Sequence, residues 1–223
     1  MRILITGATG YIGHATVPVI SKIEGSKILC LSRDLRNLHD KFDTLDLSNV
    51  YYSQSDDWDR IARFGPEIVV HLASYNPSRD DEQSIEQLID SNITFGATLI
   101  EKLSKTGNLK FFINTGSFSQ YDDGTTRKED AYFYSATKSA FDAFLDYFST
   151  TYGFKYITAV PFSVYGGETT VKRVIDYIYE SLDAEQPIAM TAGEQILDFI
   201  HVDDIANFYL SAIEAFTQNG GVF

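Results

Sequence analysis

Tyr134 and Lys138 have residue types and a spacing that suggest acid–base chemistry. They are four positions apart in a stretch with a helical pattern, residues 132–147, so both side chains share one face of the predicted helix. An ammonium group beside a phenol stabilises the phenolate and lowers its pKa from about 10 toward neutral pH, which would let Tyr134 act as a general acid or base. In a chain with 14 tyrosines the same spacing also arises by chance, as a surface lysine beside a packed ring.

A glycine-rich turn near the start of the chain supplies a second signal. Three glycines follow the apolar run 3–5 with the spacing G-x-x-G-x-x-G and precede a helical pattern. Such glycines allow a tight turn, a close approach to a pyrophosphate and a close helix–strand contact, and the helix N-terminus offers free N–H groups to an anion. Turns of this kind also occur without a nucleotide. The predicted dinucleotide-binding residues here are Gly7, Gly10, Tyr11, Ile12 and Gly13.

The elements that must position these residues alternate between strand and helix. Strands are predicted at 2–6, 27–31, 49–53, 67–72, 109–115 and 155–160, and helices at 11–24, 57–63, 84–105, 132–152, 169–183 and 203–216. This order predicts an α/β fold with a Rossmann-type, doubly wound parallel sheet and a short C-terminal substrate-binding part. We expect residues 1–160 to form the dinucleotide-binding core and residues 161–223 a partial substrate lobe, from which the segment 198–216 returns to the core.

Composition limits the classes of function. The chain has 223 residues, 44% of them hydrophobic, and a net charge of −13, which argues against nucleic acid as a partner. Its one cysteine, Cys30, lies in an apolar run and is predicted to be a buried strand residue, which fits a reducing cytoplasm. We expect no signal peptide and no membrane span. His201 with its neighbouring aspartates is interpreted as structural rather than as a metal site, with Asp203 or Asp204 capping the last helix.

Five further segments appear in an order that resembles one family. They are the strand end 69–74, the segment 90–98 with Asn92, the segment 111–121, the segment 161–166 and the segment 198–206, which reads D-F-I-H-V-D-D-I-A. With the glycine turn, they make the chain similar to the extended short-chain dehydrogenase/reductase family, in its nucleotide-sugar epimerase/dehydratase/reductase branch. The resemblance covers almost the whole chain, although family members usually continue beyond the point where this sequence stops.

The resemblance implies a catalytic triad and two sets of binding residues. Ser117 would hydrogen-bond the reacting substrate oxygen, Tyr134 would move the proton, and Lys138 would bind the nicotinamide ribose and hold the tyrosine pKa down. The further cofactor-binding residues that it implies are Leu72, Ala73, Ser74, Thr115, Pro161, Ser163 and Val164. The implied substrate residues are Asn76, Ser117, Ser119, Gln120, Lys172 and Arg173. Lys172 and Arg173 are included because Leu197 occupies the position where many family members have an arginine.

The cofactor is predicted to be NADP(H), with NAD as the alternative. NAD enzymes of this fold place an acid at the end of the second strand, where this chain has Ser32 and Arg33, which suit a 2′-phosphate. Asp34 and Arg36 lie close by and make this interpretation less clear. After the third strand, Gln54 takes the place where the family often has an aspartate near the adenine.

The set of possible reactions is narrowed because this chain lacks residues that some branches of the family require. Phe118 and Ser119 follow Ser117 where the 4,6-dehydratases of the family carry an Asp–Glu pair, and Cys30 is on the wrong strand for a 3,5-epimerase–reductase. We therefore expect 4-keto reduction or 4-epimerisation of a nucleotide sugar, and the segment 114–121 resembles the CDP-abequose and paratose synthase subgroup. A sensor or scaffold that binds NADP(H) without turnover is the non-enzymatic alternative. A homodimer through the helices at 84–105 and 132–152 is also a possibility.

Overall fold

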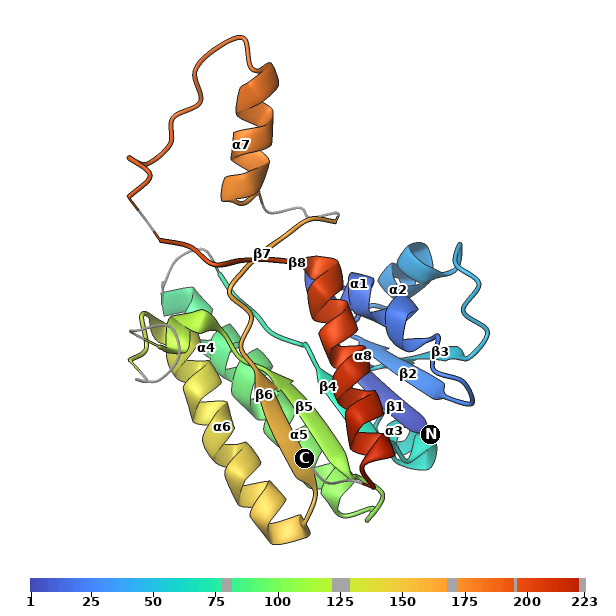
Figure 1. Ribbon diagram of the computed structural model, residues 1–223. Coiled ribbons are helices and arrows are strands. Elements are labelled where there is room, and N and C mark those ends of the chain that lie inside the picture. Colours follow the sequence, from blue (N-terminus) through green and yellow to red (C-terminus); the bar gives the residue numbers. More distant parts are fainter. Residues whose placement is uncertain (78–81, 122–128, 168–171, 195, 221–223) are drawn as a thin grey trace.

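The computed structural model describes residues 1–77, 82–121, 129–167, 172–194 and 196–220, and its centre is a parallel sheet (Figure 1). The six strands are β1 (Arg2–Thr6), β2 (Lys27–Ser32), β3 (Val50–Gln54), β4 (Ile68–His71), β5 (Phe111–Thr115) and β6 (Lys155–Ala159). Their spatial order is β3-β2-β1-β4-β5-β6, and every pairing is parallel. The connections therefore reverse direction between β1 and β4. In such sheets ligands bind at this reversal, beyond the carboxyl ends of the strands.

Helices cover both faces of the sheet, which confirms the predicted doubly wound α/β fold. One apolar core joins the sheet to α1 (Tyr11–Ile20), α2 (Leu35–Phe42) and α8 (Val202–Gln218). A second core joins the other face to α3 (Trp58–Phe64), α5 (Phe95–Ser104) and α6 (Phe133–Tyr152). Neighbouring residues of one strand divide between the cores, as Ile3 and Leu4 do, because side chains alternate along a strand. Cys30 is buried in the first core, as predicted.

The helix α2 was not predicted from the sequence. It begins where Asp34 accepts a hydrogen bond from the Arg36 N–H (2.9 Å), and it buries Leu38 and Phe42 in the first core. The signal was present, since apolar residues recur at positions 35, 38 and 42 behind an aspartate that is a good N-cap. We had interpreted the charged residues of this segment only as part of the cofactor site.

The predicted helix 84–105 is divided by a wider turn. α4 (Glu82–Ile89) continues through a π-helical turn, Asp90–Thr94, into α5. The buried Asn92 sits in this turn. π-Turns inside α-helices are frequent at functional sites, and this one lies beside the cavity described below. Across the described parts of the chain, no helix is long and apolar enough to cross a membrane.

The C-terminal part leaves the core and returns to it. β7 (Ser163–Tyr165) pairs in parallel with β8 (Phe199–His201). The segment that connects these two strands contains α7 (Val174–Asp183), which projects away from the core (Figure 1). The helix predicted at 169–183 thus begins at Val174, while residues 168–171 lie outside the described residues. The predicted cap of the last helix was wrong. His201 is the N-cap of α8, because its Nδ1 accepts the Asp203 N–H at 3.2 Å.

The helix α8 closes one face of the sheet. It packs against α1 and buries Tyr209 completely, with the phenol hydroxyl 2.8 Å from the Thr115 hydroxyl. Near its end the Phe216 ring stacks on Phe111, with the ring centroids 4.4 Å apart. The helix α8 is thereby tied to strand β5.

Candidate active site

The glycine turn leaves β1 where the sheet connections reverse. Gly7 has φ +66°, and a Cβ atom on it would lie 2.6 Å from the Ala73 nitrogen. A Cβ on Gly13 would lie 2.2 Å from the Gly7 carbonyl oxygen, so this glycine permits the close contact between α1 and the turn. The Gly10 N–H donates to the same carbonyl at 2.9 Å. These positions require glycine for steric reasons, and they hold the backbone of the turn close to the end of β4.

The hydroxyl of Thr6 joins the ends of β1 and β4. Its Oγ1 accepts the N–H groups of Leu72 (3.2 Å) and Ala73 (3.1 Å) and lies 2.9 Å from His71 Nδ1. Because both lone pairs are used, its single proton points to Nδ1, which makes His71 a neutral imidazole protonated at Nε2. Burial agrees with this assignment, since it lowers the pKa of His71 to about 3. The sequence analysis missed Thr6 and His71 as site residues.

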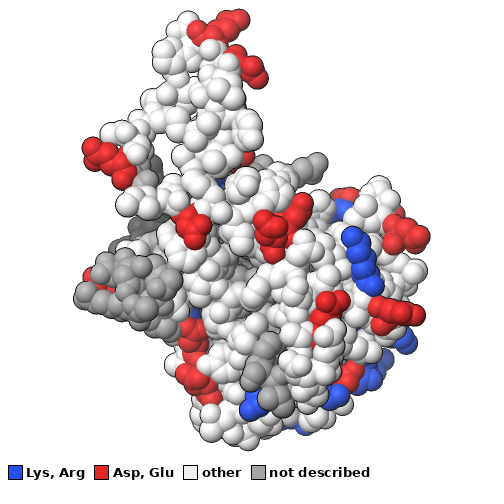
Figure 2. Space-filling view, viewed as in Figure 1, with Lys and Arg blue, Asp and Glu red and all other residues white. Residues whose placement is uncertain are grey.

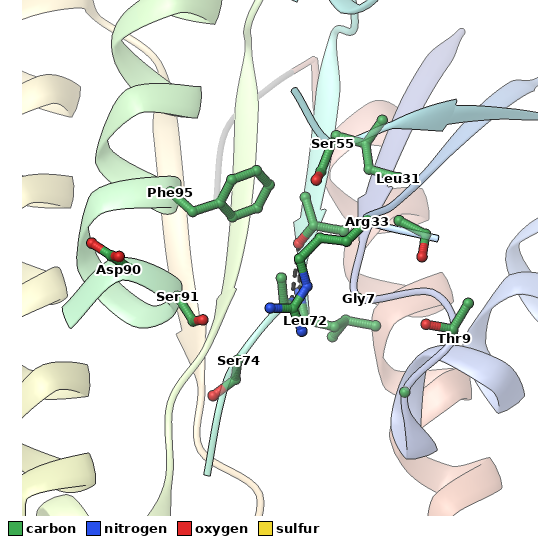
Figure 3. A pocket seen from close by; sticks show the side chains of 14 residues that line it. Gly7, Thr9, Leu31, Arg33, Ser55, Leu72, Ser74, Asp90, Ser91 and Phe95 are labelled. Carbon is green, nitrogen blue, oxygen red and sulfur yellow. Dashed lines mark hydrogen bonds between the residues drawn. The ribbon is translucent and has the colours of Figure 1, made fainter. Parts of the chain in front are cut away.

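A cavity of about 420 Å³ lies over the turn and the strand ends (Figure 3). Of the predicted cofactor residues it is lined by Gly7, Gly10, Ser32, Arg33, Leu72, Ala73 and Ser74. Its remaining lining residues are Thr6, Thr9, Leu31, Ser55, Asp90, Ser91 and Phe95. Figure 3 shows the Arg33 side chain reaching into the middle of this cavity, between Phe95 and Thr9. Tyr11, Gly13 and Gln54 do not line it, and Ser55 lies where Gln54 was expected.

A second cavity, of about 370 Å³, contains the predicted catalytic residues. Leu72 and Ser74 line both cavities, so the two adjoin. From the predicted sets the second is lined by Ile12, Leu72, Ser74, Asn76, Thr115, Ser117, Tyr134, Lys138, Pro161, Ser163, Val164 and Arg173. Its apolar side includes Phe118 and Phe162, whose rings stack 5.8 Å apart. The structure therefore brings Ser117, Tyr134 and Lys138 together around one space.

The phenol of Tyr134 shares the second cavity with two serines. Ser74 and Ser117 line this cavity with it, and their hydroxyls act to lower its pKa. Burial outweighs them and raises the pKa of Tyr134. We had expected the lysine to lower this pKa. Instead Lys138 Nζ lies 5.8 Å from the centre of the tyrosine ring and donates to the Thr115 carbonyl at 3.0 Å.

Lys138 is itself strongly affected by its surroundings. Its ammonium group is buried at the end of β5, and burial lowers its pKa to about 8, while Asp142 one turn along α6 opposes the shift. The carboxylate of Asp142 accepts hydrogen bonds from Asn114, Gln120 and the Thr158 hydroxyl. Removing a cation from water without a close anion disfavours its charged form. A ligand with negative charge in the second cavity would restore that form.

Ser117 is fixed by a short turn after β5. It is the N-cap of the 3₁₀ turn Phe118–Gln120, and its N–H donates to Gln120 Oε1 at 2.8 Å. Gln120 is fully buried, and Ser119 is 6% exposed. Neither residue lines the cavity, so the structure places these two predicted substrate residues behind Ser117 rather than beside a substrate.

Of the two basic residues that we expected near a substrate, only one lines the cavity. Lys172 is exposed and pairs with Glu180 (2.5 Å), outside the cavity lining. Arg173 lines the cavity, donates to the Val164 carbonyl at 3.0 Å, and lies 3.9 Å over the Tyr11 ring. The Tyr11 hydroxyl donates to the Gly166 carbonyl. Tyr11 therefore contacts the C-terminal part of the chain rather than lining either cavity.

Asn92 in the π-helical turn connects the loop after β4 to the catalytic helix. Its Nδ2 donates to the Tyr75 carbonyl and to Thr137 Oγ1, both at 3.0 Å. Its Oδ1 accepts the Tyr75 N–H at 2.8 Å and the Ser74 hydroxyl at 3.3 Å. Ser74 lines the second cavity together with Tyr134. The sequence analysis matched Asn92 to a motif without giving it a role in the site.

The charge of the cavities differs from that of the whole chain. Arg33, Lys138 and Arg173 line them, and Asp90 is the one carboxylate among the lining residues. Figure 2 shows acidic side chains on the projecting segment around α7 and mixed charges over the core. The chain's net charge of −13 is thus carried elsewhere. Locally positive cavities of this kind suit anionic ligands.

The fold and these cavities define a Rossmann-type protein with a dinucleotide turn and an adjoining Ser–Tyr–Lys site. This chain belongs to the NAD dependent epimerase/dehydratase family, which matches residues 3–223. The family resemblance inferred from the motifs is therefore confirmed.

Relatives and solved structures agree with this membership. A CDP-abequose synthase from Yersinia pseudotuberculosis is 25% identical over 217 residues, which span 96% of this chain and 74% of that protein. A CDP-abequose synthase from Salmonella typhimurium is 27% identical over 221 residues, 95% of this chain and 70% of that protein. The crystal structure of UDP-glucuronic acid 4-epimerase from Bacillus cereus, in complex with UDP-glucuronic acid and NAD, shares the fold with a TM-score of 0.82 and 19% identity, covering 96% of this chain and 73% of that one.

Proposed function

We propose that this protein is an NAD(P)-dependent oxidoreductase that reduces the 4-keto group of a nucleotide-activated sugar. The observation that carries the proposal is the junction of the two cavities at Leu72 and Ser74, with Ser117, Tyr134 and Lys138 around the second. The residues present fit a dinucleotide, because Gly7 and Gly10 offer backbone without a side chain to the first cavity, which the positively charged Arg33 also lines. When bound there, the nicotinamide group supplies or accepts a hydride.

The chain's own residues would handle the proton and the charge. Tyr134 gives its phenolic proton to the oxygen of the reduced carbonyl, and the Ser117 hydroxyl donates a hydrogen bond to the same oxygen. Lys138 lines the same cavity, where its ammonium group would bind the nicotinamide ribose. Without a proton donor, the reaction would leave an uncompensated alkoxide, a charge that the site must stabilise in the transition state.

A nucleotide sugar is proposed as the substrate on two grounds. The relatives above are CDP-abequose synthases, and the solved neighbour holds UDP-glucuronic acid. In this chain Arg173 and Asn76 line the second cavity, where they offer hydrogen-bond donors to phosphate and sugar oxygens. We therefore interpret residues 161–223 as a partial substrate lobe, from which 198–216 returns to the core.

Reduction has three alternatives. The Asp–Glu pair of a dehydratase is replaced by Phe118 and the buried Ser119, so water elimination has no acid and base beside Ser117. A 4-epimerase would use the same triad in both directions and would return the cofactor unchanged, so the fate of the cofactor separates it from a reductase. A sensor that binds the cofactor without turnover would have no use for Ser117, Tyr134 and Lys138 around one cavity.

The test is single-turnover hydride transfer, followed at 340 nm, with a panel of nucleotide 4-keto-deoxy sugars. We expect Tyr134→Phe to bind the cofactor normally and to lose about 10²–10⁴-fold in rate, the usual contribution of a positioned acid–base group. Tyr132→Phe is the matched control, since Tyr132 stacks on Tyr134 with ring centres 5.8 Å apart and does not line the cavity. If Tyr134→Phe transfers hydride as fast as the wild type, another group supplies the proton. If the wild-type protein binds the cofactor tightly but reduces no sugar of the panel, the sensor is favoured.

We further propose that NADP(H) is preferred to NAD(H). Arg33 reaches into the first cavity, and Ser32 lines it at the end of β2 (Figure 3). Asp34, the nearby acid, is engaged as the cap of α2 through the Arg36 N–H. Arg33→Ala should weaken NADPH binding by about 1.5–3 kcal/mol and leave NADH binding nearly unchanged, because a charge-assisted bond to the 2′-phosphate is lost. An unchanged NADPH/NADH ratio in a fluorescence titration would refute the preference.

A homodimer through α4, α5 and α6 is proposed from the apolar residues that these helices expose. They are Ile85, Ile89, Phe144, Tyr147 and Tyr152. Contiguous exposed apolar residues mark interaction surfaces. Sedimentation velocity should show a dimer that Tyr147→Glu dissociates and that the control Tyr179→Glu on α7 leaves intact. A monomeric wild-type protein would contradict this proposal.

A further inference from the structure

Three serine hydroxyls form a row that leads away from the reaction centre. Ser135 Oγ donates to Ser119 Oγ at 3.1 Å, and Ser119 Oγ lies 2.9 Å from Ser117 Oγ. Ser117 in turn lines the second cavity with Tyr134, and its hydroxyl acts to lower the pKa of the phenol. Ser135 is completely buried and Ser119 nearly so. The row therefore begins inside the protein and ends at the cavity.

The hydroxyls of the row donate in one direction, from Ser135 toward Ser117. A serine hydroxyl has one proton to donate and two lone pairs that accept. The Ser135 proton goes to Ser119, which leaves the Ser119 proton for its other hydroxyl partner, Ser117. The lone pairs of Ser117 also receive the Ser119 N–H, at 3.4 Å. The proton of Ser117 is then free to point outward, to the phenol oxygen or to a substrate oxygen.

We propose that Ser119 and Ser135 are positioning residues that orient the Ser117 hydroxyl as a donor toward the oxygen that becomes negatively charged in the reaction. This inference rests on the proposed function. Hydroxyls that donate in sequence polarise one another, so the last one becomes a stronger donor. A donor aimed in advance at a developing charge stabilises the transition state without reorganisation.

The backbone around the row restricts it to this arrangement. Ser119 lies on the turn after β5 and Ser135 on α6, so the row joins the two elements that carry Ser117 and Tyr134. The Ala131 N–H donates to the Ser119 carbonyl at 3.0 Å, and Gln120 Oε1 accepts the Ser117 N–H. The Ser117 hydroxyl also acts to lower the pKa of Tyr134 against the effect of burial, as a donor aimed at the phenolate should.

The first test needs no substrate. With ¹³C-labelled tyrosine, the Cζ resonance of Tyr134, assigned by its loss in Tyr134→Phe, reports the hydrogen bonds that the phenol oxygen accepts. We expect Ser119→Ala to move this resonance, and Ser135→Ala to move it less in the same direction. Ser104→Ala is the matched control, because Ser104 is as buried as Ser119 and its hydroxyl has no partner among the described residues. An unmoved resonance in Ser119→Ala, or an equal movement in the control, overturns the proposal.

The second test is kinetic. Ser119→Ala should lower kcat about 2–10-fold with KM nearly unchanged, since the loss of one oriented hydrogen bond has this scale. The high-pH limb of kcat should move to higher pH, because a phenolate that has lost part of its stabilisation forms later. Wild-type kcat and an unmoved limb overturn the proposal. A wild-type protein that turns over no sugar refutes the proposed function alone, and the resonance of Tyr134 still decides the inference.

Discussion

Lys138→Met should change how the stability of the protein depends on pH. The ammonium group of Lys138 is buried, and its pKa is lowered from 10.5 to about 8. Between these two values the unfolded chain binds a proton that the folded chain does not. The free energy of unfolding therefore rises with pH in this window. The stability that the folded chain gains by releasing the Lys138 proton is lost again as the pH falls through about 8.

The magnitude follows from the two pKa values. From pH 7 to about pH 9.5 the folded chain releases most of this proton while the unfolded chain keeps it, which amounts to about 2 kcal/mol at 1.36 kcal/mol per unit. The methionine variant lacks the group and therefore this gain. The difference in unfolding free energy, wild type minus Lys138→Met, should grow by about 2 kcal/mol over that range, whatever its value at pH 7.

Urea unfolding of both proteins without cofactor, at several pH values in this range, measures the difference, and other titrating groups cancel between them. Lys155→Met is the control, because Lys155 is an exposed lysine on β6. Its difference should stay flat. Parallel curves for wild type and Lys138→Met would show that the folded chain keeps the Lys138 proton, and would refute our account of this buried group.

Two further predictions concern the dinucleotide turn. Gly13→Ala should destabilise the fold by about 1–3 kcal/mol, the range for overpacking, and weaken cofactor binding, because the new Cβ meets the Gly7 carbonyl 2.2 Å away. Chemical unfolding measures the first effect and a fluorescence titration the second. A normal cofactor affinity would contradict the role assigned to the glycine turn. Thr6→Val should cost about 2–4 kcal/mol, since it keeps the shape but leaves the Ala73 N–H and the buried His71 Nδ1 without the Thr6 hydroxyl as partner. Thr6→Ser should restore most of the loss in the same unfolding assay.

The sheet could be predicted because its strands are short apolar runs separated by helical patterns. β1 and β5, for example, are buried along nearly their whole length, and such runs are typical of parallel sheets covered on both faces. The glycine turn could be placed because Gly7, Gly10 and Gly13 follow such a run directly. These signals are local, so one sequence is enough to find them.

The features that sequence analysis missed depend on contacts between distant segments. Lys138 was expected to act on Tyr134 four residues away, yet its partner is the carbonyl of Thr115 on another element. Ser119 was expected at the substrate, and it is buried because α6 packs over the turn that carries it. The π-helical turn at Asn92 likewise follows from hydrogen bonds to Tyr75 and Thr137, which no periodic pattern encodes.

The return of α8 to the sheet has a consequence for how the protein is made. The strands and α1 are complete by residue 159, but the face shared with α1 is closed by Tyr209, Ile213 and Phe216, close to the end of the described chain. During synthesis from the N-terminus, a ribosome-bound chain would carry the assembled sheet with part of this apolar face exposed until α8 emerges. Exposed surface of this kind promotes aggregation and chaperone binding. The rate at which α8 docks should therefore limit the yield of native protein.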